Sequence, residues 1–227
     1  INCDYKRTVY DKDIDYVFYK KINKIIAVSN YGKESIVSVN EEYRNKVEVI
    51  LDIVNPDLIK QMGNQEVVFK DKKYINILTV ARLIIGYKGL DIAIKTAKKL
   101  KENGYKFKWY IVGEGPDRAL IEKMILEYEV EDVFILLGQK INPYSYMKYC
   151  DIYVQPSRKE GFGLTVIEAK ILKKLIVCTN FDTAKEIINN EEDGLIVGIN
   201  EQSLYLGIEK YLEDTDFKNK IIENLKK

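Results

Sequence analysis

The stretch IYVQPSRKEGFGLTVIEA, residues 152–169, decides the fold of this chain. It begins with the apolar segment Ile152–Gln155, passes through a turn that contains Gly161 and Gly163, and ends in the helix-forming run Leu164–Leu172. A buried strand, a glycine-rich turn and a helix form the repeating unit of an open parallel sheet. Ligands of such sheets bind beyond the carboxyl ends of the strands, so this turn is a candidate site.

The same alternation of strands and helices extends in both directions along the chain. Short apolar runs predict strands at Ile75–Ala81, Phe107–Val112, Val133–Leu137, Ile152–Gln155, Leu175–Cys178 and Leu195–Val197. Helical spacing predicts helices at Asp91–Asn103, Asp117–Tyr128, Pro143–Tyr149, Leu164–Leu172, Thr183–Asn189, Gln202–Leu212 and Phe217–Leu225. Gly104 stands where a glycine commonly ends a helix. We therefore expect an α/β fold with a Rossmann-like parallel sheet and helices on both faces.

The beginning of the chain has a different organisation. Strands are expected at Ile25–Ser29 and Val47–Leu51 with a helix at Gly32–Val39 between them, and Val54–Asp57 is expected to be a turn or linker because Pro56 disfavours helix at Asn55. One such unit is too small to hold a core alone. We therefore expect residues 1–57 to be the tail of a preceding α/β domain and residues 58–227 to be a second domain. The chain does not begin with Met, and we expect it to be a fragment of a longer polypeptide.

The composition excludes several classes of function. The 36 Lys and Arg and 35 Asp and Glu residues give a net charge of +1, so no overall field draws the molecule to nucleic acid. The absence of histidine removes the commonest general base and metal ligand. Cys3, Cys150 and Cys178 match no zinc spacing and are expected to be reduced thiols. No apolar run is long enough for a membrane span, and the first ten residues, INCDYKRTVY, lack the apolar region of a signal peptide.

Two aspartate clusters imitate the DxD motif that binds metal ions in some sugar transferases. The sequence Asp11-Lys12-Asp13-Ile14-Asp15 lies in a charged segment before any predicted strand, so a solvated loop is the favoured interpretation. Asp214-Thr215-Asp216 is expected to be a turn between two helices. We therefore predict no metal site and no cofactor.

The residues around the glycine turn are suited to a nucleotide diphosphate. The unpaired N–H groups at the start of the helix near Leu164 would bind an anion, and Gly161 and Gly163 allow a ligand to approach the backbone. Glu168 lies about one helical turn further on, where its carboxylate can accept hydrogen bonds from two ribose hydroxyls. Glu160 precedes the glycines and would face a sugar. The alternative for Glu160 and Glu168 is that both are solvated glutamates beside a structural turn.

The segment Glu160–Glu168 resembles the E-x7-E motif of retaining glycosyltransferases of the GT-B fold, specifically the large group 1 (GT4) family. Further segments resemble that family in the expected order over about residues 23–200. They are Ala81-Arg82, Tyr87-Lys88-Gly89-Leu90, Val112-Gly113-Glu114-Gly115-Pro116, Leu137-Gly138-Gln139, Asp151–Ser157 and, upstream, Ile26–Ser29 and Val49-Ile50. The chain departs from the family pattern at Lys173-Lys174-Leu175-Ile176 and at Phe181-Asp182-Thr183, a loop that borders the donor sugar in relatives, whereas Glu186 keeps its place.

The resemblance implies roles for particular residues. Arg82, Lys88 and Glu160 would be catalytic, with Arg82 and Lys88 neutralising the donor diphosphate and Glu160 holding sugar hydroxyls. The remaining donor-binding residues would be Gly113, Gly138, Lys140, Ile141, Gly161, Phe162, Gly163, Leu164, Thr165 and Glu168. The position of Arg82 and Lys88 at the end of a buried strand favours this role over that of a solvated surface pair.

The implied function is transfer of a sugar, with retention, from a UDP- or GDP-sugar to a saccharide or lipid-linked acceptor in bacterial surface polysaccharide synthesis. Such an enzyme would be cytoplasmic, with at most peripheral contact with the inner face of the membrane, and its acceptor-binding N-terminal domain would lie outside this chain. The alternative is a nucleotide-sugar-binding module that is inactive without a partner domain. An epimerase of the same fold is disfavoured because the full E-x7-E context is absent from that class.

Overall fold

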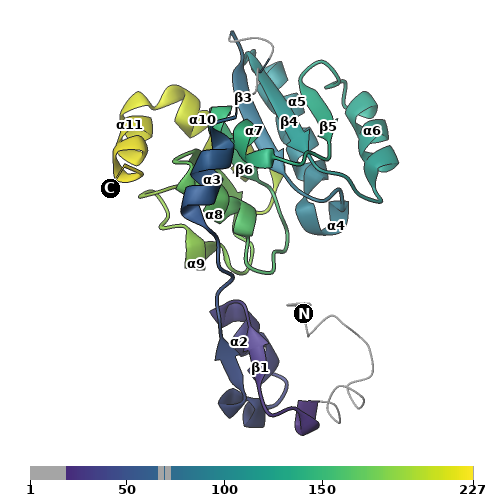
Figure 1. Ribbon diagram of the computed structural model, residues 1–227. Helices are drawn as coiled ribbons and strands as arrows, with labels where there is room; N and C mark the ends of the chain where they lie inside the picture. Colours follow the sequence, from purple (N-terminus) through teal and green to yellow (C-terminus); the bar gives the residue numbers. More distant parts are fainter. Residues whose placement is uncertain (1–18, 66–68, 70–72, 227) are drawn as a thin grey trace. The chain divides into compact units, whose positions relative to one another are not determined.

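The computed structural model describes residues 19–65, 69 and 73–226 (Figure 1). The chain forms two compact units. The smaller unit runs to Ile53 and includes the segment Glu160–Phe162, and the larger unit consists of Val54–Lys159 and Gly163–Lys227.

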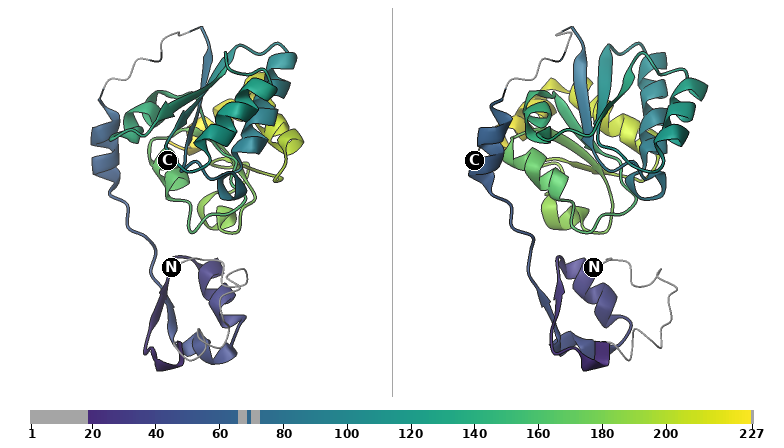
Figure 2. Two further views of the ribbon diagram at one scale, coloured as in Figure 1. Left: turned by 90° about the vertical axis from the view of Figure 1, so that its right-hand side faces the viewer. Right: turned by 45° about the vertical axis from the view of Figure 1, so that its right-hand side comes forward.

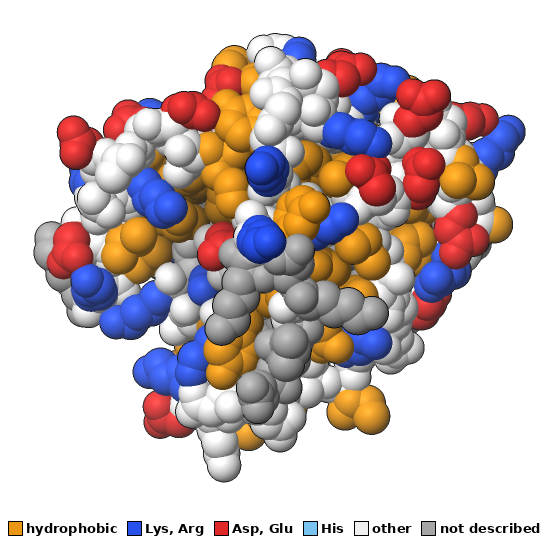
Figure 3. Space-filling view, turned by 90° about the horizontal axis from the view of Figure 1, so that it is seen from above, with side chains coloured by type: hydrophobic (Ala, Val, Ile, Leu, Met, Phe, Trp, Pro, Cys, Tyr) orange, Lys and Arg blue, Asp and Glu red, His pale blue; other side chains and the backbone are white. Residues whose placement is uncertain are grey.

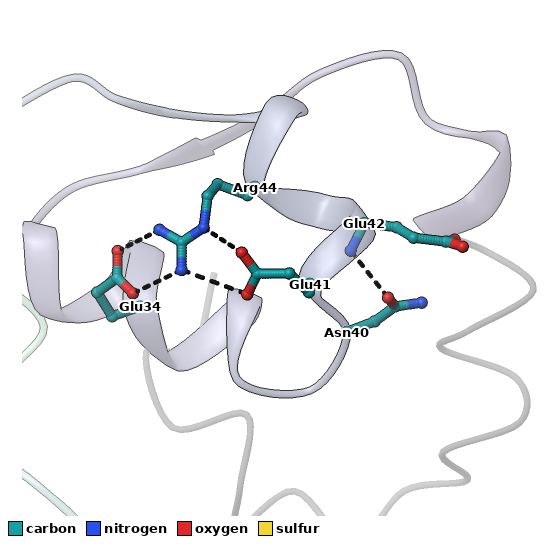
Figure 4. A network of polar contacts seen from close by, with 5 residues as sticks. All are labelled: Glu34, Asn40, Glu41, Glu42 and Arg44. Carbon is teal, nitrogen blue, oxygen red and sulfur yellow. Dashed lines mark hydrogen bonds and ion pairs between the residues drawn. The ribbon is translucent and has the colours of Figure 1, made fainter.

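The smaller unit contains the predicted strand–helix–strand arrangement. Strand β1 (Ile25–Ala27) pairs in parallel with β2 (Val47–Val49), and helix α2 (Asn30–Val37) and the short 3₁₀ helix η1 (Glu41–Asn45) connect them. The core of the described part consists of Ile25, Ala27, Ile36, Val37, Tyr43 and Val47. On its surface, the guanidinium of Arg44 lies between the carboxylates of Glu34 and Glu41 and donates to Glu34 at 3.0 and 3.3 Å (Figure 4).

The larger unit is built on a six-stranded sheet in which every pairing is parallel. Its strands, in chain order, are β3 (Ile75–Val80), β4 (Phe107–Val112), β5 (Phe134–Gly138), β6 (Ile152–Gln155), β7 (Leu175–Thr179) and β8 (Leu195–Val197). Their order in the sheet is β5-β4-β3-β6-β7-β8. The chain therefore moves outward from β3 in one direction and from β6 in the other, so the order reverses between these two strands. This is the doubly wound arrangement that the sequence predicts.

Helices cover both faces of the sheet (Figure 2). One layer consists of α5 (Leu90–Glu102), α6 (Arg118–Glu127), α10 (Glu201–Glu213) and α11 (Thr215–Asn224). The other consists of α3 (Pro56–Gly63), α7 (Pro143–Tyr149) and α8 (Leu164–Ile171). Two one-turn helices, α4 (Ile85–Lys88) and α9 (Ala184–Ile187), lie in the loops that follow β3 and β7. The strands are apolar on both sides because both faces are covered.

A buried hydrogen-bond chain fixes the central strands to one another. Trp109 of β4 has no exposed surface, and its indole Nε1 donates to Thr79 Oγ1 of β3 at 3.1 Å. The Thr79 hydroxyl in turn donates to the carbonyl of Val154 on β6 at 2.7 Å. The buried polar side-chain atoms of Trp109 and Thr79 are therefore both paired, which removes the penalty for burying them. These bonds connect β3 to β6, the two strands between which the strand order reverses.

The structure contains two short helices that the sequence did not predict. Val54–Asp57 is not a simple turn, because α3 begins at Pro56. Pro56 takes the first helical position, and the side chain of Asn55 caps the helix by accepting from the N–H groups of Asp57 and Leu58. The short helix α4 was also absent from the prediction; Asp117 holds its first residue, Ile85, through a bond from the Ile85 N–H to the carboxylate at 2.8 Å.

Candidate functional site

The predicted residues of the larger unit gather at one edge of its sheet. Arg82 and Lys88 follow β3, Gly113 follows β4, and Gly138 ends β5. Leu164, Thr165 and Glu168 lie on α8, which follows β6. Because all six strands are parallel, these positions share the carboxyl edge, and β3 and β6 border the point where the strand order reverses. This is the place where open α/β sheets bind ligands.

The loop after β3 lies directly against the end of β6. Arg82 is exposed there, and Lys88, the last residue of α4, is half-buried. The next residue, Gly89, has φ +62°, and a Cβ atom added to it would lie 2.0 Å from the carbonyl oxygen of Pro156. Glycine is required at such a position for both its backbone angle and its size. The close approach brings the segment that carries Lys88 to the start of the predicted motif.

The amino end of α8 presents unpaired backbone groups. Gly163 precedes the helix with φ +93°, and no side chain of the described residues caps this end. The first N–H groups of the helix belong to Leu164 and Thr165. The hydroxyl of Thr165 points toward the sheet and donates to Gln155 Oε1 at 3.2 Å. Thr165 therefore offers a ligand its N–H rather than its hydroxyl, and the helix end is suited to an anion.

Glu168 has a partner that the sequence did not predict. It is half-buried, and the hydroxyl of Tyr144 on α7 donates to its Oε1 at 3.1 Å. Burial raises the pKa of the Glu168 carboxyl, and the hydrogen bond from Tyr144 opposes that rise. Because Tyr144 occupies one oxygen, the other remains for hydroxyl donors on a ligand. In the sequence, Tyr144 lies at the start of the predicted helix Pro143–Tyr149, but nothing there pairs it with Glu168.

The loops after β4 and β5 are joined by a backbone hydrogen bond. The N–H of Gly113 donates to the carbonyl of Gly138 at 3.0 Å. Lys140 follows Gly138, and its ammonium group lies 5.9 Å from the ring centroid of Tyr146. Ile141 is fully exposed. Gly113 and Gly138 are thus direct neighbours, whereas the side chain of Ile141 extends into solvent.

The remaining predicted residues, Glu160, Gly161 and Phe162, form the bend before Gly163. Glu160 is half-buried, Gly161 is exposed and Phe162 is buried. This segment groups with the smaller unit.

The aspartate clusters show no metal-binding arrangement where the structure describes them. Asp11, Asp13 and Asp15 lie outside the described residues. Asp214 caps α11 by accepting from the N–H of Phe217 at 2.8 Å, so Thr215 and Asp216 begin a helix rather than continue a turn. Residues 19–65, 69 and 73–226 contain no group of three or more Cys, Asp and Glu side chains placed to hold a metal ion. No helix within these ranges has both the length and the apolar character needed to cross a membrane.

The opposite, amino edge of the sheet carries a hollow of about 520 Å³ beside Asp151 and several lysines. Two of those lysines donate hydrogen bonds to backbone carbonyl groups near the carboxyl ends of helices. Lys173 donates to the carbonyl of Lys226 at 3.2 Å and Lys174 to that of Lys148 at 2.8 Å. Figure 3, seen from this side, shows basic side chains mixed with acidic and hydrophobic ones. Two of the lysines beside this hollow are thus engaged in contacts within the fold, and the carboxyl edge is the stronger candidate site.

The strand order defines the larger unit as an α/β domain of the doubly wound kind. The chain belongs to the family of glycosyl transferases group 1, whose model matches residues 62–227. It is 30% identical over 219 residues to the N-acetylgalactosamine-N,N'-diacetylbacillosaminyl-diphospho-undecaprenol 4-alpha-N-acetylgalactosaminyltransferase of Campylobacter jejuni, covering 94% of this chain and 58% of that protein. It is 26% identical over 212 residues to the capsular polysaccharide biosynthesis glycosyltransferase CapM of Staphylococcus aureus, covering 89% of this chain and 56% of that protein.

Solved structures show the same architecture. The Anabaena protein HepE in complex with UDP and glucose aligns with a TM-score of 0.80 at 19% identity, covering 92% of this chain and 59% of that one. The chain thus spans somewhat more than half the length of these similar proteins. The family and the GT-B type of α/β fold expected from the sequence are confirmed.

Proposed function

We propose that the larger unit binds the donor of a glycosyltransferase that moves a sugar, with retention, from a UDP- or GDP-sugar to an acceptor. The observation that carries this proposal is the arrangement at the reversal of strand order. The loop with Arg82 and Lys88 packs against the end of β6, and the uncapped end of α8 and Glu168 follow on the same edge.

Each group has a physical role in this proposal. A nucleoside diphosphate gains negative charge as the bond to the sugar breaks, and groups placed in advance stabilise that charge best. Arg82 supplies a planar fork of donors and Lys88 a compact charge. The N–H groups of Leu164 and Thr165 supply the helix end. Glu168 accepts from the ribose hydroxyls, and Glu160 holds hydroxyls of the donor sugar.

Retention places the acceptor on the face from which the diphosphate departs. In the proposed reaction the acceptor oxygen forms the new bond to the anomeric carbon and the diphosphate oxygen takes its proton. Glu160 orients the sugar and forms no covalent bond to it. No metal ion is needed, because Arg82, Lys88 and the helix end provide the positive potential.

The names of relatives support a biological setting. The Campylobacter relative is named for a diphospho-undecaprenol acceptor and the Staphylococcus relative for capsular polysaccharide biosynthesis. We accordingly propose a saccharide or lipid-linked acceptor and a role in bacterial surface polysaccharide synthesis, in the cytoplasm at the inner face of the membrane.

Binding and turnover separate this proposal from its alternative. UDP, GDP and their sugars are titrated into the chain by calorimetry, with and without EDTA, and donor hydrolysis is measured in parallel. Binding that survives EDTA, together with release of sugar from one donor, supports the transferase. Binding without turnover on any acceptor supports the second candidate, a donor-binding module that is inactive without a partner acceptor domain. No binding of any nucleotide contradicts both.

A further inference from the structure

The structure assigns a positioning role to Arg158 and Asp91, two residues outside the predicted site. We infer that their ion pair fixes Lys88 relative to the start of α8, so that both contact the same diphosphate. This inference rests on the proposed function. It concerns how the site is held and not which residues touch the ligand.

The contacts of the Arg158 side chain are unusually complete. Its Nη1 and Nη2 atoms donate to the two carboxylate oxygens of Asp91 at 2.7 and 2.6 Å, and Nη1 also donates to the carbonyl of Ile85 at 3.1 Å. The side chains of Arg158 and Asp91 are 34% and 17% exposed, so water screens this pair less than an open surface pair. A bidentate pair of this kind fixes direction as well as distance.

The backbone beside Arg158 makes a second set of contacts with the same helix. The N–H groups of Arg158 and Lys159 donate to the carbonyl of Tyr87 at 2.7 and 3.2 Å. Carbonyl groups of Ile85 and Tyr87, both in α4, therefore accept from one short segment of the motif loop. Lys88 is the next residue after Tyr87, so its backbone position depends directly on these bonds.

Helix α4 needs this support because it is only four residues long. A single helical turn is unstable on its own. Asp117 accepts from the N–H of Ile85, the first residue of α4, and the guanidinium of Arg158 donates to the carbonyl of the same residue. Asp91 lies in the first turn of α5, where a carboxylate is favourable. The pair thus joins α4, the start of α5 and the motif loop.

The pKa shifts of Asp91 and Arg158 agree with an ion pair between them. Burial acts to raise the pKa of the Asp91 carboxyl, but the hydrogen bonds and charge of Arg158 hold that pKa below its ordinary value. The same pairing raises the pKa of Arg158. Both partners are therefore ionised throughout the neutral range.

The test compares a nucleoside diphosphate with its monophosphate. Arg158→Gln, Asp91→Asn and the double variant are titrated with UDP and UMP, or with GDP and GMP if guanine is the base. We expect the diphosphate to bind about tenfold more weakly to each single variant, since charged hydrogen bonds hold Lys88 in place. The monophosphate should lose less than about twofold, and the double variant should lose little more than either single one. Arg158→Lys, which keeps the charge without the fork, should recover only part of the loss.

Arg44→Gln is the matched control, because Arg44 makes a bidentate pair with Glu34 (Figure 4) and neither residue is among the proposed donor-binding residues. It should leave both affinities unchanged. Equal losses for diphosphate and monophosphate, or no loss in the two single variants, would overturn the inference while leaving the proposed function intact. Failure of the unaltered chain to bind any nucleotide would instead overturn the proposed function and the inference with it. If Arg158→Gln does not fold, Asp91→Asn and Arg158→Lys give the same comparison.

Discussion

Replacing Glu168 by alanine should weaken nucleotide binding by removing the acceptor for the ribose hydroxyls. Glu168 is half-buried on α8, and the hydroxyl of Tyr144 already holds one of its oxygens at 3.1 Å. The carboxylate is therefore oriented before a ligand arrives, and little conformational entropy is lost on binding. The substitution changes neither Arg82 nor Lys88, so contacts to the diphosphate should remain.

The size of the effect follows from the burial of this carboxylate. Hydrogen bonds to a charged group contribute about 1.5–3 kcal/mol where water is excluded. Because Glu168 remains partly exposed, we expect the lower part of that range, about 2 kcal/mol, which corresponds to about a thirtyfold rise in Kd. Tyr144→Phe keeps the carboxylate and removes one neutral donor, so about 1 kcal/mol, or about fivefold, is expected.

Calorimetric titration with two ligands isolates the ribose contact. UDP or GDP, whichever binds more tightly, is compared with its 2′,3′-dideoxy form, which lacks both hydroxyls. Glu168→Ala should lose affinity for the ordinary nucleotide and bind the dideoxy nucleotide as the unaltered chain does. An equal loss for both ligands would refute the reasoning, because it would show that Glu168 acts on the fold of the site and not on the ribose.

Three further predictions concern other parts of the site. Glu160→Ala should leave the Kd of the free nucleotide unchanged but reduce donor-sugar binding or transfer; an equal loss for the free nucleotide would contradict the division of roles. Gly89→Ala places a methyl group 2.0 Å from the Pro156 oxygen, on a residue with φ +62°. This substitution should destabilise the fold by about 2 kcal/mol or more and lower Tm by several degrees. Gly86→Ala is the control and should leave Tm unchanged, because a Cβ atom added there meets no other group within 4 Å. Because burial raises the pKa of Glu168, its contribution to folding stability is greatest below its unfolded pKa and is lost as pH rises through the folded pKa. Nucleotide affinity should change oppositely, increasing as Glu168 ionises, and a Glu168→Gln variant should lose this pH dependence in titrations between acidic and neutral pH.

The sheet was predictable because its strands are buried on both faces. Runs such as Ile75–Ala81 and Phe107–Val112 have no polar face to confuse with an amphipathic helix. Helix α3 was missed because Pro56 was interpreted as a break, although proline favours the first position of a helix. Helix α4 was missed for a different reason: four residues carry no periodicity, and its first residue, Ile85, is held by Asp117 and Arg158 from other segments.

The candidate site also contains residues that could be predicted from the sequence and residues that could not. Candidate residues that directly follow a strand, such as Gly113 and Arg82, could be placed from the order of strands alone. Tyr144 and the pair Arg158–Asp91 could not, because they depend on side chains 24 and 67 residues apart meeting in space. Turn residues such as Pro143, Gly89 and Pro156 lie near them in the sequence, but nothing there indicates which distant side chain each would contact.

The buried polar residues beneath the motif explain why its backbone can serve as a fixed anion site. Gln155 has no exposed surface, yet its Nε2 donates to Ser157 Oγ at 2.8 Å and its Oε1 accepts from Tyr153 at 2.7 Å and from Thr165. A buried amide is costly unless its groups are paired, and here the partners come from β6 itself and from the first turn of α8. The orientation of α8 is therefore set by folding and not by the ligand. An N–H group held in place in this way stabilises developing charge without reorganising, which is the property that the proposed departure of a diphosphate requires.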